Sequence, residues 1–296
     1  MAGSKVVQHF DPPFEISMPA RLTAPILFNS PHSGSVYPAS FLAASKLDAL
    51  TLRRSEDCYV DELFAGVVER GAPLMLAHFP RAYVDVNREP YELDPEMFCE
   101  PLPAVANTRS LRVAGGLGTI PRVVSEAAEI YAAPLTLAEA QRRIEELYKP
   151  YHAGLSALLG EIRQVFGAAL LIDCHSMPSL ARDRRPVRPD FVLGDRFSIA
   201  CAPEIVDAAE RSLRSLGYSV TCNRPYAGGY ITQRYGAPRS GFHALQIEIN
   251  RALYVNEQTL EKSPGFDELA DNLLRFAAVM MDAAGAAFSA TQCAAE

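Results

Sequence analysis

The sequence has no run of about 20 apolar residues, the length that a helix needs to cross a bilayer. Its N-terminus, MAGSKVVQHFDPPFEI, lacks the positively charged start and apolar core of a secretion signal. It also has no block of lysine and arginine interleaved with aromatic residues, and its formal net charge is -7. We therefore expect a cytoplasmic protein with neither a membrane nor a nucleic-acid partner.

The sequence also lacks any C-x-x-C pair, although it contains six cysteines. Cysteines scattered in this way predict neither a disulfide framework nor a zinc site made of thiolates, so reduced thiols are expected. The six positions are Cys58, Cys99, Cys174, Cys201, Cys222 and Cys293.

Apolar material is plentiful, because 49% of the 296 residues are hydrophobic, which is enough for one large core. No repeat or composition shift marks a domain boundary, so we expect a single domain over residues 1–296. Apolar runs rich in β-branched residues alternate with segments of helical period, which predicts an α/β fold with a mostly parallel or mixed sheet. Strands are predicted at Pro25–Phe28, Pro73–Ala77, Tyr83–Val86, Ala168–Ile172, Tyr218–Thr221 and His243–Ile249, and helices at about Ser55–Arg70, Leu137–Leu159, Pro203–Leu216 and Phe266–Ala284.

Residues 90–134 differ from the rest of the chain, since they contain several prolines and a GGLG stretch and show no sustained period. We predict a long loop or lid there, because structureless connections of this length inside a compact domain are usually functional. A flexible surface excursion is the alternative.

Two histidines follow directly on predicted strands, His32 in NSPHSG and His175 in LLIDCHSM. Ligand sites of open α/β sheets lie beyond the carboxyl ends of the strands, so the two imidazoles are expected to share a site if their strands are neighbours. Imidazole is the commonest protein ligand of zinc, and a catalytic zinc has three protein ligands and one open position. A buried structural role is the alternative, although small residues rather than apolar ones surround both.

The third ligand would preferably be a carboxylate, and RRSEDCYVDELF offers Glu56 and Asp57 at the start of a predicted helix that Ser55 could cap. Acidic residues in a first helical turn also complement the helix dipole without binding anything, so this pattern leaves both explanations open. The remaining histidines, His9, His78, His152 and His243, fit structural or solvated roles better, with His243 buried in its strand.

The strand LQIEIN alternates Gln246, Glu248 and Asn250 with apolar residues, so one whole face of the strand is polar. A solvated edge strand would show the same alternation. If the polar face looks into a metal site instead, Glu248 could be the general base that takes a proton from the attacking water.

Basic side chains form a further element of the candidate site. A guanidinium fork binds carboxylates bidentately, so a pocket that brings two arginines together would favour a small dianionic substrate. Surface salt bridges are the alternative for each arginine, and an aspartate among them could equally form a structural pair. The residues concerned are Arg81, Asp85, Asn87 and Arg88 in RAYVDVNREP, Arg234 in ITQRYG and Arg251 in INRALY.

Taken in order, SPHSG, RRSEDCYVDEL, RAYVDVNRE, DCHSMPS and ALQIEINRALY resemble the N-formylglutamate amidohydrolase family over about residues 25–260. The resemblance implies a zinc exopeptidase-like fold, a mixed and mostly parallel central sheet flanked by helices on both faces. It implies a metal-dependent amidohydrolase, with Zn2+ or another divalent ion, that cleaves N-formyl-L-glutamate to L-glutamate and formate in histidine degradation. It leaves the oligomeric state open.

At the matching positions, the resemblance implies metal ligands at His32, Asp57 and His175, with Glu56 as the alternative acidic ligand. Zinc carboxypeptidases place their acidic ligand within one helical turn of the first histidine, whereas PHSGSVYP has no acidic residue. The resemblance also implies that Glu248 is the general base. It implies that Asn87 and Arg88 bind a substrate carboxylate, and that Arg81 and Arg251 bind the carboxylates or the oxyanion. Arg234 is expected to bind substrate because it is one of the arginines of the candidate site.

Two rival hypotheses remain. A related enzyme could cleave another N-formyl or N-acyl acidic amino acid, because acyl specificity depends on pocket volume. A protein of the same fold could instead bind a small dicarboxylate without chemistry. The presence of both histidines and of Glu248 argues against the second rival, because a carboxylate binder needs no water-activating base.

Overall fold

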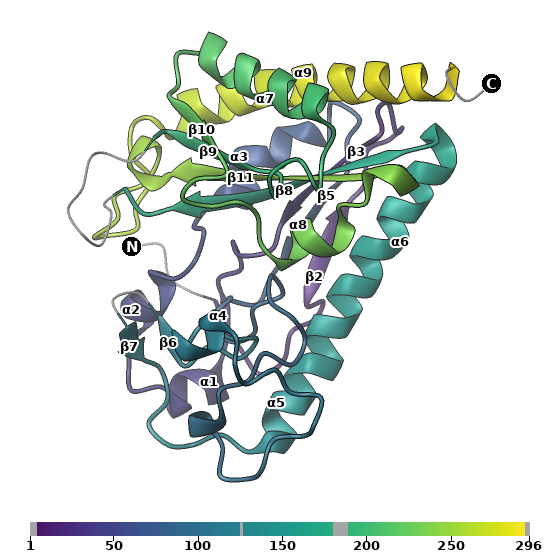
Figure 1. Cartoon of the computed structure of the whole chain (residues 1–296). Helices are drawn as coiled ribbons and strands as arrows, with labels where there is room; N and C mark the ends of the chain where they lie inside the picture. Colours follow the sequence, from purple (N-terminus) through teal and green to yellow (C-terminus); the bar gives the residue numbers. More distant parts are fainter. Residues whose placement is uncertain (1–4, 125–126, 180–188, 294–296) are drawn as a thin grey trace. The chain divides into compact units, whose positions relative to one another are not determined.

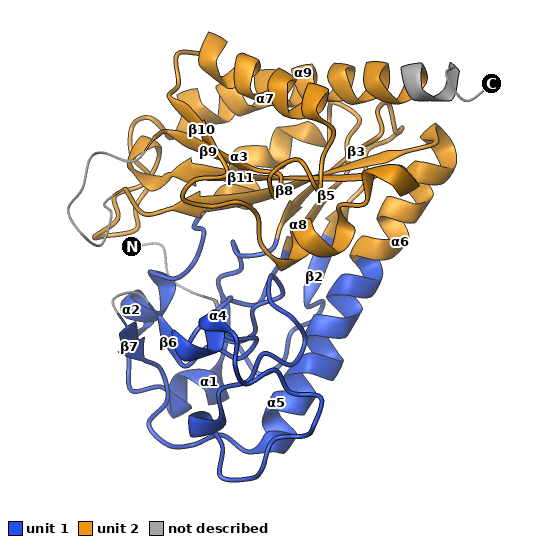
Figure 2. Cartoon of the chain, in the orientation of Figure 1, with its two compact units in different colours: residues 1–15, 31–58, 77–154 blue, residues 16–30, 59–76, 155–296 orange. Residues whose placement is uncertain are grey.

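The computed structural model describes residues 5–124, 127–179 and 189–293. The chain divides into two compact units, each assembled from separate stretches of sequence (Figure 2). Unit 1 comprises residues 1–15, 31–58 and 77–154, and unit 2 comprises residues 16–30, 59–76 and 155–296. The expectation of one domain over residues 1–296 stays a prediction.

Unit 2 is built on a seven-stranded sheet with the order β10-β9-β11-β8-β3-β5-β2 (Figure 1). The pairs β10–β9, β11–β8, β8–β3 and β3–β5 are parallel, and β9 runs antiparallel to β11. The predicted α/β fold with a mixed, mostly parallel sheet is therefore confirmed. The strands are β10 (Val220–Cys222), β9 (Phe191–Gly194), β11 (Phe242–Asn250), β8 (Ala169–Met177), β3 (Ile26–Ser30), β5 (Leu74–Ala77) and β2 (Phe14–Ser17).

Helices of unit 2 lie on both faces of this sheet (Figure 1). One face is covered by α3 (Val60–Phe64), α7 (Pro203–Ser215) and α9 (Phe266–Cys293), and α8 (Tyr230–Tyr235) lies on the other. Single 3-10 turns are η1 (Ala65–Val67), η5 (Pro238–Ser240) and η6 (Arg251–Leu253). No helix in the described part of the chain is long and apolar enough to span a membrane.

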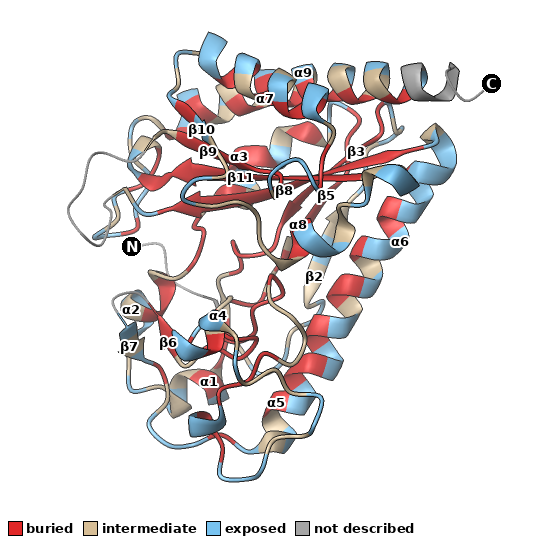
Figure 3. Cartoon of the chain, in the orientation of Figure 1, coloured by how far each residue is buried: buried red, intermediate tan, exposed pale blue. Residues whose placement is uncertain are grey.

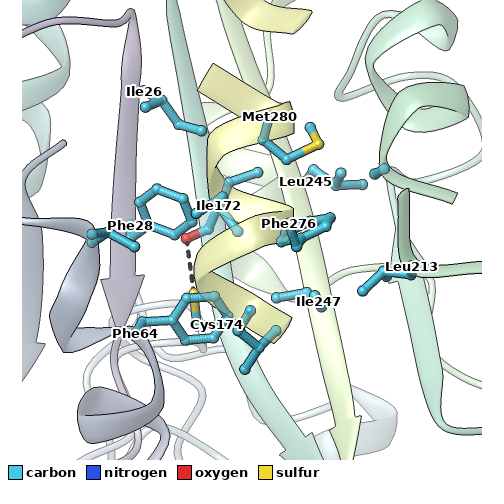
Figure 4. Packing of buried hydrophobic residues seen from close by; sticks show 14 of the residues in the cluster. Ile26, Phe28, Phe64, Ile172, Cys174, Leu213, Leu245, Ile247, Phe276 and Met280 are labelled. Carbon is cyan, nitrogen blue, oxygen red and sulfur yellow. Dashed lines mark hydrogen bonds between the residues drawn. The ribbon is translucent and has the colours of Figure 1, made fainter. Parts of the chain in front are cut away.

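The core of unit 2 forms where the central strands meet α9 (Figure 4). Strands buried on both faces read as nearly continuous apolar runs, which makes β3 and β8 recognisable in the sequence, whereas β11 is recognisable by its alternation of apolar and polar residues. These strands are buried along almost their whole length (Figure 3). Full burial stabilises each large apolar side chain by about 1.5–3 kcal/mol. The labelled strand residues of this core are Ile26, Phe28, Ile172, Cys174, Leu245 and Ile247, and those of α9 are Phe276 and Met280.

Unit 1 has mostly short elements joined by loops. β1 (Lys5–Val7) pairs in parallel with β4 (Val36–Pro38), and β6 (Val123–Val124) pairs antiparallel with β7 (Ala128–Glu129). The helices are α1 (Ala39–Ala44), α2 (Ala49–Arg53), the 3-10 turn η2 (Pro95–Met97), α4 (Leu111–Ala114), α5 (Leu137–Arg143), the π-helical turn η4 (Ile144–Tyr148) and α6 (Lys149–Phe166), which from Leu155 onward belongs to unit 2.

Residues 90–134 lie entirely in unit 1. In their described part, η2, α4, β6 and β7 have two to four residues each, joined by long irregular connections. This agrees with the expected lack of a sustained period. Closure of the segment over a substrate stays a prediction.

The predicted strand Tyr83–Val86 is wrong, because these residues form turns in unit 1. The Tyr83 N–H donates to the carbonyl oxygen of Pro80, and the Tyr83 ring lies 3.8 Å from the guanidinium carbon of Arg143. Arg143 is only 2% exposed and also donates to the hydroxyl of Tyr131. The Tyr83 ring thus packs against a buried arginine rather than in a sheet.

The predicted helix Ser55–Arg70 is also wrong at its start, since α3 begins at Val60. Ser55 does not cap it, and its hydroxyl donates to the Leu52 carbonyl instead. Tyr59, the residue before α3, has a left-handed backbone with φ 62°, which separates the preceding turn from the helix. Glu56 and Asp57 therefore lie in this turn, whereas Asp61 and Glu62 lie in the first turn of α3.

We expect Gly34→Ala to lower the free energy of unfolding by about 1–3 kcal/mol, measured by urea titration. An added Cβ at this position of the NSPHSG segment would lie 2.2 Å from the carbonyl oxygen of Phe79, so backbone must move. Gly160→Ala in α6 is the control, because nothing lies within 4 Å of its added Cβ. That control should gain up to about 1 kcal/mol. Equal effects of the two changes would contradict the close approach at Gly34.

Candidate metal and amide-hydrolysis site

His32 lies two residues beyond the end of β3, in unit 1. Its side chain is 1% exposed, and a carboxylate of the same unit faces each ring nitrogen. Nδ1 is 3.4 Å from an oxygen of Asp57, and Nε2 is 2.8 Å from an oxygen of Asp85. A histidine in this setting can donate a proton to one carboxylate while its other nitrogen binds a cation beside the second.

Two neighbouring carboxylates in the turn before α3, those of Glu56 and Asp57, have different partners. The Asp57 N–H donates to the His32 carbonyl oxygen at 2.9 Å, which ties this aspartate to the histidine through backbone as well as side chain. Glu56 instead accepts hydrogen bonds from the Tyr37 hydroxyl at 2.6 Å and from Arg53 Nε at 3.1 Å. Burial raises the pKa of Glu56, and its contacts with Arg53 and Tyr37 oppose that rise.

Three basic side chains surround the buried carboxylate of Asp85. Its Oδ2 lies 2.7 Å from Arg81 Nη2 and 3.7 Å from Arg88 Nη2, and its Oδ1 faces His32 and accepts from the Asn87 N–H at 2.9 Å. Burial by itself would raise the pKa of Asp85, but Arg88, His32 and Arg81 together hold it well below its usual range. The carboxylate is therefore ionised, and it connects the RAYVDVNRE segment to His32.

The two arginines beside Asp85 are partly engaged within unit 1. Arg88 donates from Nε to the Leu117 carbonyl and from Nη1 to the Asn87 carbonyl, both at 2.8 Å. The side chain of Arg88 is 13% exposed and that of Arg81 is 23% exposed. Because two guanidinium groups share one carboxylate, this cluster keeps one positive charge in excess, which favours an anionic ligand.

His175 is held within unit 2 by a relay between neighbouring strands. Asn29 of β3 lies opposite Asp173 of β8, and its Nδ2 donates to Asp173 Oδ1 at 2.8 Å. The other oxygen of Asp173 lies 3.0 Å from His175 Nε2. Residues two apart on a strand share a face, so the carboxylate in IDCH lies next to the imidazole. This spacing could have revealed Asp173 in the sequence.

The polar face of β11 is buried. Gln246, Glu248 and Asn250 are 4%, 8% and 4% exposed, and β11 lies between β8 and β9 rather than at an edge of the sheet. The alternative of a solvated edge strand is therefore wrong. Glu248 lies opposite His175 in the register of β11 and β8, and its Oε1 accepts a hydrogen bond from Gln246 Nε2 at 2.9 Å.

The last two arginines have different surroundings. Arg251 is 8% exposed and donates from Nε to the hydroxyl of Ser176 at 3.0 Å, next to His175 in the chain. Arg234 is an exposed residue of α8, with its Nη1 3.4 Å from the Tyr230 hydroxyl. Arg251 is thus held next to the end of β8, whereas Arg234 projects from a helix surface.

His32, Asp57 and His175 are the one group of His, Cys, Asp or Glu side chains, among the residues that the structure describes, that could hold a metal ion. All three are buried.

As expected from its strand, His243 is buried and accepts a hydrogen bond from the Ala202 N–H. Asp85 was expected only as a partner of the arginines, and its contact with His32 had no signal in the local sequence.

Known proteins resemble this chain over most of its length. The sequence profile of the N-formylglutamate amidohydrolase family matches residues 24–255. N-formylglutamate deformylases of Pseudomonas aeruginosa and Pseudomonas putida are 29% and 28% identical, over 79% of this chain and 83% and 82% of theirs. The crystal structure of N-formylglutamate amidohydrolase from Ralstonia eutropha JMP134 has a TM-score of 0.85 and 38% identity, covering 92% of this chain and 97% of that one. A gene product of Agrobacterium tumefaciens shares the fold, with a TM-score of 0.65 and 19% identity over 91% of this chain and 94% of that one.

Tyr37→Phe is expected to lower the free energy of unfolding by about 1.5–3 kcal/mol, because it removes a hydrogen bond to the buried carboxylate of Glu56. Chemical denaturation measures this difference. Glu129→Gln is the control in the same unit, because its exposed ion pair with Lys46 is screened by water and should contribute little. A Tyr37 variant as stable as the control would show that Glu56 does not depend on this contact.

Proposed function

Because the chain belongs to the N-formylglutamate amidohydrolase family, we propose that it hydrolyses N-formyl-L-glutamate to formate and L-glutamate. The two Pseudomonas relatives are named as deformylases of this compound. The observation that carries the proposal is that both strand-end histidines of the family segment have a buried carboxylate on one ring nitrogen. A role in histidine degradation and a cytoplasmic location belong to the same proposal.

A divalent metal ion, with Zn2+ as the first choice, fits His32, Asp57 and His175. Two imidazoles and one carboxylate are a ligand set of catalytic zinc, which keeps a further position open. Ligating histidines usually donate their second ring nitrogen to a carboxylate, and Asp85 and Asp173 are placed to accept these hydrogen bonds. Other divalent metals also accept these donors.

The path of the chain supports this ligand set. β3 and β8 are parallel neighbours, with Asn29 opposite Asp173. His32 follows Asn29 by three residues and His175 follows Asp173 by two, so both histidines come at the same ends of adjacent strands. Asp57 lies next to His32, because its backbone N–H donates a hydrogen bond to the His32 carbonyl oxygen.

Glu248 is proposed as the general base. A bound metal supplies Lewis acidity, which lowers the pKa of a water molecule and polarises a carbonyl group. Glu248 takes a proton from the attacking water and gives it to the amide nitrogen as the C–N bond breaks, so that formate and the amino group of glutamate are released. Its position opposite His175 in the strand register places this carboxylate beside the proposed metal ligand.

The substrate carboxylates are assigned to the basic residues. Arg81, Asn87 and Arg88 are proposed to bind one carboxylate, supported by the excess positive charge around Asp85. Arg251 is proposed for the second carboxylate or the oxyanion. Arg234 is also proposed to bind substrate, from an exposed position on α8 where its Nη1 lies 3.4 Å from the Tyr230 hydroxyl.

A hydrolase of another N-formyl or N-acyl acidic amino acid is the nearest alternative, since the same residues would perform the same steps. A dicarboxylate-binding protein without activity is the other. The buried Glu248 on the polar face of β11 favours hydrolysis, because a protein that only binds a dicarboxylate needs no water-activating base.

The purified protein is expected to release formate from N-formyl-L-glutamate, to lose this activity with a chelator and to regain it with added zinc. Acetate release from N-acetyl-L-glutamate is measured in parallel and should be much slower. Formate release that is insensitive to the chelator would overturn the metal proposal. Release of neither acid by zinc-loaded protein would overturn the proposed substrate.

Three substitutions should separate the roles of the acidic residues. Glu248→Gln is expected to keep the metal and to lower kcat at least about 100-fold, because the base is lost. Asp57→Asn is expected to lose most of the bound metal, measured by elemental analysis. Glu56→Gln is its neighbouring control and should keep the metal. Metal loss from Glu56→Gln but not from Asp57→Asn would reverse the ligand assignment.

A further inference from the structure

Gln246 precedes Glu248 by two positions on β11, and both side chains are buried on the same face of the strand. Its Nε2 donates to Glu248 Oε1 at 2.9 Å. Its Oε1 accepts from the Gly229 N–H at 2.7 Å and lies 3.5 Å from the Thr232 hydroxyl. The amide thus bridges the proposed general base and the backbone before α8.

The hydrogen bonds of this amide have one consistent direction. A backbone N–H can only donate, so the side-chain oxygen of Gln246 must face Gly229. The NH2 group then faces Glu248, and an ionised carboxylate can only accept. If the amide were rotated by half a turn, its oxygen would face the Glu248 carboxylate, which also accepts, and its NH2 group would face the Gly229 N–H, which also donates. The hydrogen bonds therefore determine the orientation of the Gln246 amide.

The Gly229 N–H is held in place by close backbone packing. Gly194 lies opposite Gln246 in the pairing of β9 with β11. An added Cβ at Gly194 would lie 2.7 Å from the Gly228 nitrogen and 2.8 Å from the Ala227 carbonyl carbon. The loop before α8 therefore lies against β9 with no room for a side chain between them, and it presents the Gly229 N–H at the position of Gln246.

We propose that Gln246 is a positioning residue for hydrolysis, which holds the Glu248 carboxylate in the orientation that accepts the proton of the attacking water. This inference rests on the proposed function, in which Glu248 is the general base. The amide of Gln246 is a neutral donor, so it restrains the carboxylate without placing a second charge beside it. A buried base without this restraint would sample other rotamers, and misplacement by about 1 Å can slow a reaction about 100-fold.

The test compares kcat, KM, metal content and melting temperature for wild type and Gln246→Glu. This change keeps an oxygen for the Gly229 N–H but replaces the donor to Glu248 by a second carboxylate. We expect kcat to fall about 10–100-fold, with KM within about twofold and the metal content unchanged. Gln246→Met, which retains length but neither polar group, serves if the first variant folds poorly, and the same fall in kcat is expected of it.

Asn250→Asp is the matched control, because it makes the same amide-to-carboxylate change two residues beyond Glu248 on the same face. It should keep a kcat near that of wild type. The double variant Gln246→Glu/Glu248→Gln exchanges the two groups and keeps one hydrogen bond between them. Its melting temperature should return toward that of wild type, because one carboxylate and one amide again face each other. Its kcat should stay low, because the carboxylate is no longer at position 248.

A wild-type kcat in Gln246→Glu or Gln246→Met, while Glu248→Gln is inactive, would overturn the positioning role and leave the proposed function intact. A wild-type rate in Glu248→Gln would instead overturn the proposed base. An equal loss of kcat in Asn250→Asp would show a general charge effect, which also overturns the role of Gln246.

Discussion

β8 pairs in parallel with β3 on one side and with β11 on the other, and the register of these pairs determines where the polar side chains of the three strands lie. Alternate residues of β8 face opposite ways, so Ile172 and Cys174 enter the core while Asp173 and His175 face the other side. A slip by one residue would exchange the two sets and place charge in the core. The apolar residues therefore enforce the arrangement of the polar ones.

Buried charge is the second constraint, and it is met by clusters rather than by isolated pairs. Asp85 takes its contacts from two arginines and a histidine, and Glu56 takes its contacts from Arg53 and Tyr37. Desolvation offsets most of the attraction inside such clusters, so they add little net stability. These clusters instead determine the orientation of the carboxylates, because a carboxylate whose hydrogen-bond partners are all held in place can adopt one rotamer.

The sequence was sufficient where a feature depended on local pattern. The apolar runs predicted β3, with His32 after it, and β8, although β8 continues through His175 to Met177, and Pro203 predicted the start of α7. It was insufficient where a distant partner decided the outcome. β11 is not an edge strand because it pairs with β9, whose four residues are too short to predict. Glu56 differs from Asp57 because it accepts a hydrogen bond from Tyr37, which lies 19 residues earlier in the chain. Which residues bind metal or substrate stays a prediction.

The hydrogen bond from Asn29 to Asp173 joins residues 144 apart in the chain, and this separation bears on the order of events during synthesis. β3 and its neighbour β5 leave the ribosome long before β8 does. Non-local pairs form late, because the entropy of closing a long loop must be met first. A nascent chain that ends before β8 carries His32 and Asp57 but not His175. The group that could hold a metal ion can therefore assemble only after more than half of the polypeptide has been made.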